Sequence, residues 1–437
     1  MQANTSPTPS HHESKLERVE SLIAGEKPEE DISAALATLP PPPDGGLWAW
    51  LQVVAALFCN FNSWGVVNAF GVYQEYYQQT LLKDESPFRI SWIVSLSGSL
   101  LLFGTNFFGG FVDLGYMKHI AFLGCFLQFA ALMLLSWSKT YAEVILTQGL
   151  FSGIISSMLF LLSISTVAPY FSKKRPLAIG LGASGSSLGG TVYSSIARKL
   201  ITSVGFGWST RIIAFIQLAT TFIMFLCIRR RLPPTQRKAF IAHECLKEPV
   251  FMLYVVGNMC GFLGLYVFYV YYESYAVSIN PNVNAFLYMT AVINAGSFLG
   301  RILPAYVATY VGPLNVLIPC EIGGLVVLFC WMVAKSEGAI IAIAVIFGFI
   351  SGPLIGLPGA IVSSLTKDFN RLGIRLSFAF TFFSFGIVLG PSIAGIIQRK
   401  YGWFWLQLYA GLSWVALIIC HVLARIIHSR GKLMVKM

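Results

Sequence analysis

Long apolar stretches recur along the chain from Leu47 onward, and short polar segments separate them. Each stretch has close to the roughly 20 apolar residues that a helix needs to cross a bilayer. They lie at 47–73, 88–112, 119–137, 142–168, 176–197, 208–228, 251–275, 285–308, 313–334, 338–365, 374–397 and 403–427. The twelve stretches form two groups of six, at 47–228 and 251–427, as in internally duplicated transporters. The pattern predicts an all-α integral membrane protein with twelve transmembrane helices in two pseudo-symmetric six-helix halves.

Composition agrees with this pattern. The chain has 437 residues, of which 56% are apolar and only 11% are charged, whereas soluble domains are typically about 25% charged. This low content of charged residues excludes an ordinary soluble enzyme, and we expect the lipid bilayer to be a partner of the protein.

The polar segments have separate properties. The leader, 1–46, carries eight acids and three bases, a net charge of −5, and contains few apolar residues. We expect it to be disordered. It lacks the basic start and apolar core of a signal peptide, so the first span should be an uncleaved anchor. A basic linker at 229–250 joins the two halves, and a short tail at 428–437 ends the chain.

The distribution of basic residues predicts the topology. If the leader is cytoplasmic, cytoplasmic segments hold twenty Lys and Arg and outer loops hold seven. Bases favour the cytoplasmic side, so both termini, with the linker, are predicted to be cytoplasmic. We expect a multi-pass protein of the cell membrane rather than of the vacuolar membrane. The net charge of +11 is then explained by topology, and no nucleic-acid partner is expected.

Enzyme motifs are nearly absent from the sequence. Gly180, Gly182 and Gly185 formally match a dinucleotide-binding pattern, but they lie inside an apolar span and not between a strand and an exposed helix start. Small residues at four-residue spacing indicate close helix packing instead. The histidines are scattered. We therefore expect no enzymatic activity, no cofactor and no metal.

Arg301 is the most informative charged residue because it stands inside the eighth span. An arginine at the centre of a span costs about 2.5–3.5 kcal/mol on insertion scales. It could bind an anionic group of a substrate in a water-filled interior, or extend to the cytoplasmic interface. Glu321 in the ninth span is expected to serve as a partner or scaffold. Glu75 and Glu273 lie near the outer ends of their spans, where we expect them to be hydrated.

Other candidates for the cavity wall are polar or aromatic. Tyr266 and Tyr269 in the seventh span are three residues apart and share a helix face, which would suit a flat or aromatic substrate. Asn68 in the first span and Asn294 in the eighth are polar at membrane depth. They could bind substrate or join helices by hydrogen bonds.

Two motifs carry a family resemblance. One is the sequence Pro43-Asp44-Gly45-Gly46-Leu47-Trp48-Ala49-Trp50, before the first span, and the other is Tyr170-Phe171-Ser172-Lys173-Lys174-Arg175-Pro176-Leu177-Ala178-Ile179-Gly180, continuing to Gly185. Together they resemble the signatures of the monocarboxylate transporter family of the major facilitator superfamily. The likeness covers about residues 43–427 and is greatest to the fungal branch. It implies the major facilitator fold, alternating access, and a tether from Asp44 to the loop at Lys173–Arg175.

Departures from the family pattern narrow the prediction. Between the second and third spans Gly109, Asp113 and Gly115 match the superfamily motif, but Leu114 replaces its arginine. Proton-coupled lactate carriers have a lysine and an aspartate where this chain has Asn68 and Ser297. Arg301 is therefore retained without either partner, which argues against lactate–proton symport.

The sequence thus predicts a secondary active or facilitative transporter, which moves an organic acid or secondary metabolite and works in the direction of export. The substrate is expected to be a small anionic or aromatic molecule, and a proton is a candidate coupling ion. Two alternatives stay open: proton-coupled uptake of a small monocarboxylate or vitamin, and a transporter-like nutrient sensor that moves nothing.

Overall fold

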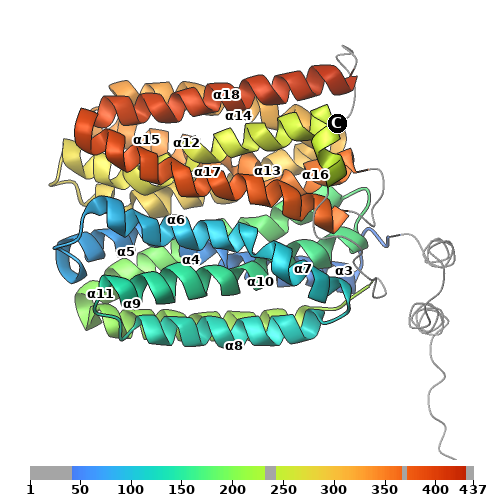
Figure 1. Cartoon of the computed structure of the whole chain (residues 1–437), viewed down its shortest axis with the longest axis horizontal. Coiled ribbons are helices and arrows are strands. Elements are labelled where there is room, and N and C mark those ends of the chain that lie inside the picture. Colours follow the sequence, from blue (N-terminus) through green and yellow to red (C-terminus); the bar gives the residue numbers. More distant parts are fainter. Residues whose placement is uncertain (1–41, 232–242, 367–371, 430–437) are drawn as a thin grey trace, which may run out of the picture.

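The computed structural model describes residues 42–231, 243–366 and 372–429. All regular elements in these ranges are helical, and the long helices run side by side along one axis (Figure 1). Most of the predicted leader, the middle of the predicted linker and almost all of the predicted tail lie outside the described residues.

The N-terminal helices account for six crossings of the bundle. Several crossings are divided into short pieces, because the helix bends or changes its hydrogen-bonding pattern within the span. The pieces are α3 (Leu47–Asn62), α4 (Trp64–Asn68), α5 (Phe70–Tyr76), η1 (Tyr77–Leu81), α6 (Pro87–Phe103), α7 (Thr105–Asp113), α8 (Met117–Leu135), α9 (Tyr141–Val144), η2 (Ile145–Phe151), α10 (Ser152–Val167), η3 (Ala168–Tyr170) and α11 (Arg175–Cys227).

The C-terminal helices make six further crossings. They are η4 (His243–Lys247), α12 (Pro249–Ile279), η5 (Asn284–Tyr288), α13 (Met289–Val311), α14 (Pro313–Val333), α15 (Glu337–Gly356), α16 (Pro358–Leu365), α17 (Leu372–Tyr401) and α18 (Trp403–Ser429). Of these, α12, α14 and α16 begin with a proline, as does α6. Proline suits the first turn because its fixed φ is helical and its missing N–H would have no partner there.

Eleven stretches of the described residues are long and apolar enough to cross a membrane. One of them, α11, contains two crossings, because its backbone breaks at Gly205 with φ +80° and ψ 165°. A left-handed φ favours glycine, which has no Cβ to clash with the backbone. The break therefore gives twelve crossings, and the predicted twelve-helix membrane fold is confirmed.

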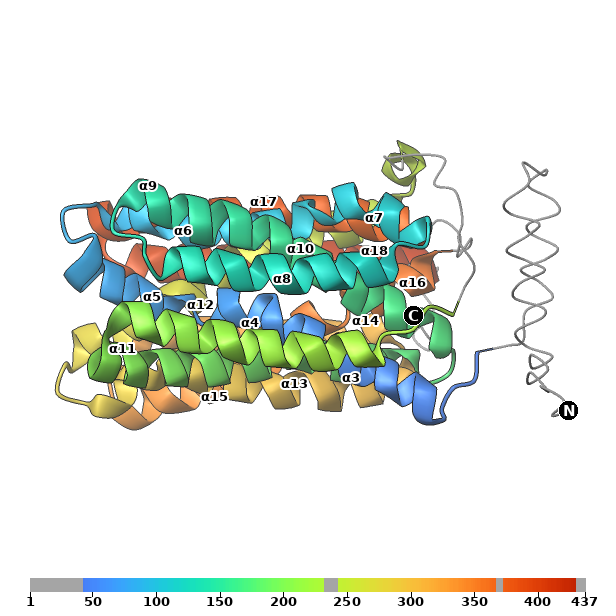
Figure 2. The same ribbon diagram turned by 90° about the horizontal axis from the view of Figure 1, so that it is seen from below.

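The two sets of helices form two layers (Figure 1). Across the boundary α6 packs against α17, and α11 packs against α13. The start of α3 and the end of α18 lie at the same end of the bundle, as expected for an even number of crossings (Figures 1 and 2). We call this end the terminal end and the opposite one the far end.

Glycine allows the closest helix contacts. A Cβ on Gly185 of α11 would lie 2.0 Å from the carbonyl oxygen of Leu57 on α3, and one on Gly182 would lie 3.0 Å from the Cβ of Ala56. In the other half, a Cβ on Gly300 of α13 would lie 2.0 Å from the carbonyl oxygen of Phe349 on α15. These glycines allow neighbouring backbones to touch, as small residues do between membrane helices.

Candidate substrate-binding site

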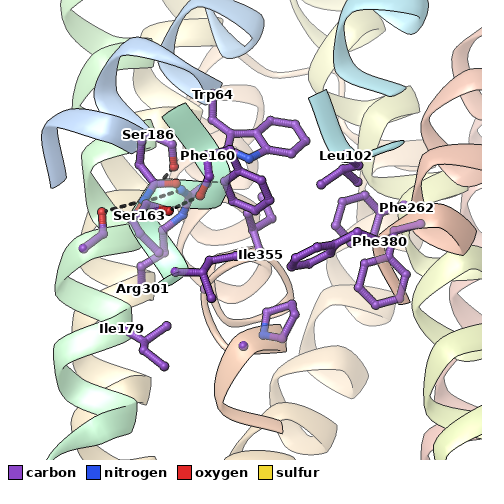
Figure 3. A pocket seen from close by; sticks show the side chains of 18 residues that line it. Trp64, Leu102, Phe160, Ser163, Ile179, Ser186, Phe262, Arg301, Ile355 and Phe380 are labelled. Carbon is purple, nitrogen blue, oxygen red and sulfur yellow. Dashed lines mark hydrogen bonds between the residues drawn. The ribbon is translucent and has the colours of Figure 1, made fainter. Parts of the chain in front are cut away.

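A cavity lies between the two layers of helices (Figure 3). The space between its walls amounts to about 590 Å³ when the part that is open to the surroundings is included. Its walls come from both halves: α3, α4, α6, α10 and α11 on one side, and α12, α13, α15, α16 and α17 on the other. The lining residues of α11 fall between Ile179 and Ser186, near the start of that helix at the terminal end.

Arg301 forms part of the cavity wall. The side chain projects from α13, and only 1% of the residue is exposed. Its Nη1 donates a hydrogen bond to the carbonyl oxygen of Ala183 on α11, at 2.8 Å. Its Nε and Nη2 have no hydrogen-bond partner among the described protein atoms, and no described carboxylate pairs with the guanidinium. Nε and Nη2 form one edge of the guanidinium, which can bind a carboxylate through two parallel hydrogen bonds.

Aromatic side chains make up much of the remaining wall. Trp64 stands perpendicular to Phe160, with ring centroids 5.8 Å apart, and Phe160 contacts Phe380 at 5.3 Å. Phe262 stacks on Phe383 at 5.4 Å. Such a wall favours an apolar, planar ligand body.

Tyr266 and Tyr269 lie next to this wall rather than on the cavity lining. Tyr266 packs between Trp64, at a centroid distance of 6.2 Å, and Phe262, at 5.9 Å. Tyr269 lies 6.2 Å from Tyr266. Both phenol hydroxyls are buried, and both interact electrostatically with the Arg301 guanidinium, that of Tyr269 more strongly than that of Tyr266. The structure thus brings the two tyrosines together, as their spacing predicts.

Of the two predicted asparagines, Asn68 makes a hydrogen bond to a neighbouring helix, whereas the hydrogen bond of Asn294 lies within α13. Asn68 donates to the carbonyl oxygen of Ser186 on α11 at 3.4 Å, and Asn294 donates to that of Thr290 at 2.8 Å. Asn294 packs so closely on α11 that a Cβ on Gly190 would lie 2.6 Å from its Cγ. Neither side chain lines the cavity, whereas Asn60 does and also donates to the carbonyl oxygen of Gly182 at 3.2 Å.

The motif residues lie at the terminal end. Asp44 Oδ1 accepts hydrogen bonds from the backbone N–H groups of Ser172, at 2.6 Å, and Lys174, at 3.4 Å. Asp44 thus contacts the predicted loop, and it does so through the backbone amides of that loop. Gly46, which follows Gly45, has φ +85° just before α3 begins. Asp113 ends α7.

An ion-pair network near the far end links the two halves. Arg198 on α11 pairs with Glu75 on α5 at 2.7 Å and with Glu273 on α12. The second oxygen of Glu273 accepts hydrogen bonds from the backbone N–H and the hydroxyl of Thr290, at 2.9 and 2.7 Å. The expectation that Glu273 is hydrated was wrong, because the residue is only 7% exposed.

Glu321 is a scaffold partner, as expected. Its Oε1 lies 2.6 Å from Nδ1 of His421 on α18, and both residues are almost fully buried. The His421 ring stacks on Tyr254 of α12 with a centroid distance of 5.2 Å. The pair thus fixes α12, α14 and α18 to one another away from the cavity.

Sequence reasoning missed the aromatic lining residues of the cavity, which are Trp64, Phe160, Phe262, Phe380 and Phe383. Each shares its span with at least one other aromatic residue, and the lining forms only when four helices meet. The feature of the sequence that could have identified them is their position near the middle of spans that are rich in glycine or polar residues.

A twelve-helix bundle with a cavity between its halves, one unpaired cation in the wall and closure at one end defines a membrane transporter for small molecules rather than an enzyme. Residues 52–336 match the model of the Major Facilitator Superfamily. The chain belongs to this superfamily and is a multi-pass membrane protein.

The chain is also similar to several fungal transporters. It is 37% identical over 375 residues to the MFS-type transporter dbaD of Emericella nidulans. This match covers 85% of this chain and 84% of the relative. It is 35% identical over 401 residues to the agnestins efflux protein AgnL12 of Paecilomyces divaricatus, covering 91% and 92%. A third relative is the aspyridones efflux protein apdF of Emericella nidulans, at 32% identity over 368 residues, covering 83% and 74%.

Proposed function

We propose that the protein exports an organic acid or acidic secondary metabolite, and that Arg301 binds the acid group. The observation that carries this proposal is the buried guanidinium with a free Nε–Nη2 edge on the cavity wall. A buried charge without a counter-ion is costly, so an anionic substrate would lower the free energy of the occupied state. The efflux function in the names of two relatives supports the direction of transport.

The transport cycle follows from two halves, 47–228 and 251–427, that rock about the cavity. In this structure the cavity lies toward the terminal end, while the Arg198 network holds the far end shut. With both termini in the cytoplasm of a cell-membrane protein, this conformation would load substrate from the cytoplasm. We also propose that the chain belongs to the monocarboxylate transporter family of this superfamily, because its two sequence motifs resemble the signatures of that family.

Metabolite profiling tests the proposal. Cells with and without the protein are compared for acids inside and in the medium, and the compound that accumulates inside without it is the candidate substrate. Arg301→Ala should reproduce the accumulation while the variant reaches the membrane in normal amount. Arg301→Lys keeps the charge but not the two-point edge, so it should restore transport only in part. Normal export by Arg301→Ala would refute the role of Arg301.

We further infer that a proton gradient drives transport, because the sequence contains no ATP-binding motif and the movement needs another energy source. Purified protein in vesicles with a trapped pH dye should move protons in the direction opposite to the exported acid. Export without any proton movement would leave facilitated diffusion as the mode of transport.

A further inference from the structure

The buried polar atoms of the cavity wall that lack a partner are all N–H groups. They are Nε and Nη2 of Arg301 and Nε1 of Trp64, and their residues are only 1% and 3% exposed. In Figure 3 the indole nitrogen of Trp64 lies on the edge of the ring that is turned toward the interior of the cavity. A buried N–H without an acceptor raises the free energy of the empty site.

The surroundings of Trp64 do not supply a strong acceptor. Phe160 stands at 89° to the indole, with a centroid distance of 5.8 Å, and a ring face accepts hydrogen bonds only weakly. On the other side Tyr266 packs against the indole at 6.2 Å and 33°. The ring is thus held by aromatic contacts that leave its N–H available to a ligand oxygen.

The two donors stand on opposite halves of the protein. Trp64 belongs to α4, and Arg301 belongs to α13. A ligand that reaches both therefore contacts both halves at once. Much of the remaining wall is aromatic, with Phe160, Phe262 and Phe380.

We propose that the substrate is a planar aromatic acid with a second, uncharged acceptor oxygen, such as a ketone, and that Trp64 Nε1 donates to that oxygen while Arg301 binds the acid. This inference rests on the proposed function and specifies its substrate class. The acid sets the affinity for Arg301. The second oxygen selects among acids, because a ligand that lacks it leaves the indole N–H buried and unpaired.

A matched pair of probe ligands tests the role of Trp64. The purified full chain in lipid nanodiscs is titrated with 9-oxofluorene-2-carboxylate and with fluorene-2-carboxylate, which differ only in the ketone oxygen. Calorimetry should show that the keto acid binds about 3- to 10-fold more tightly, the equivalent of one hydrogen bond. The carboxamide of the keto compound should bind weakly, because it lacks the charge that pairs with Arg301.

Variants separate this inference from the proposed function. Trp64→Phe keeps an aromatic ring but removes the donor, so both acids should bind with equal affinity. Trp405→Phe, at a 52% exposed position, should keep the preference. Arg301→Gln should weaken both acids alike, and unchanged binding in that variant would refute the anion site rather than the role of Trp64.

Three results would overturn the inference about Trp64. They are equal binding of the two acids by the wild-type protein, a preference for the keto acid that survives in Trp64→Phe, and no binding of the keto acid at all. The comparison in the wild-type protein needs no variant, so it stands even if Trp64→Phe does not fold.

Discussion

Removing the carboxylate of Glu273 should open the far end of the transporter. Arg198 on α11 and Glu75 on α5 belong to one half, whereas Glu273 on α12 and Thr290 on α13 belong to the other. Glu273 is the carboxylate through which Arg198 pairs with the opposite half, where the guanidinium also lies 5.7 Å from the ring of Tyr288. In Glu273→Gln this charged contact is lost, while Arg198 keeps Glu75 as a partner.

The size of the effect follows from burial. The Glu273 and Arg198 side chains are 9% and 13% exposed, whereas that of Glu75 is 31% exposed. A hydrogen bond to a charged group contributes about 1.5–3 kcal/mol. If water replaces the contact in the open state, Glu273→Gln should shift the ratio of open to closed far ends by about 10- to 150-fold. Glu75→Gln should have a smaller effect, because exposed pairs contribute about 0–1 kcal/mol.

Cysteine accessibility measures this shift. Tyr269 lies one turn from Glu273 on α12, between the ion-pair network and the cavity, and is only 7% exposed. Tyr269→Cys is labelled on intact cells with a membrane-impermeant maleimide, and the rate is corrected for the protein without this substitution. Labelling should be faster when Glu273→Gln is added.

Glu337→Gln is the matched control. Glu337 is also a far-end carboxylate with one hydrogen-bond partner, Asn280 at 3.1 Å, but both belong to the same half. It should leave the labelling rate unchanged. An equal rate with and without Glu273→Gln, or an equal increase in the control, would refute the assignment of the network as the closure of the far end.

Three further predictions concern packing, the tether and the buried pair. Gly185→Ala places a Cβ 2.0 Å from the carbonyl oxygen of Leu57, so it should lower the free energy of unfolding by about 1–3 kcal/mol and lower the Tm. Gly338→Ala is the control and should leave the Tm unchanged, because a Cβ on Gly338 would have no atom within 4 Å. Asp44→Ala removes the acceptor for the backbone N–H of Ser172 and should lower the Tm. Asp44→Asn should lower the Tm much less, because asparagine also tolerates the φ of +51°. An equal decrease in Tm in the two variants would contradict the tether. Glu321→Ala leaves Nδ1 of His421 buried without its partner and should cost about 1–3 kcal/mol, more than Glu321→Gln. A Tm equal to that of Glu321→Gln would contradict this prediction.

The fold could be predicted from the sequence because apolar length reports membrane crossing directly. The twelve spans, the glycine contacts of α11 and the importance of Arg301 all depend on local sequence and on the cost of polarity in lipid. Span ends were less accurate. The fifth span was expected to end at residue 197, but its helix continues to the break at Gly205.

Because α11 continues to Gly205, Arg198 lies in a helix and not in an outer loop. As a residue of an outer loop it would count only toward topology. As a residue of α11 it points at two carboxylates from other helices. The pairing could not be predicted, because Glu75 and Glu273 are far from Arg198 in the sequence and meet only when α5, α11 and α12 pack.

Arg198 and Arg301 show why partners, and not burial alone, separate a structural arginine from a binding one. Both lie inside helices of the bundle and are largely shielded from water. Arg198 is paired with two carboxylates of the chain, so a substrate anion would have to compete with both of them. Arg301 has one carbonyl partner and a free edge that opens on the cavity. An added anion would supply the negative charge that Arg301 lacks, and for this reason we propose closure for Arg198 and substrate binding for Arg301.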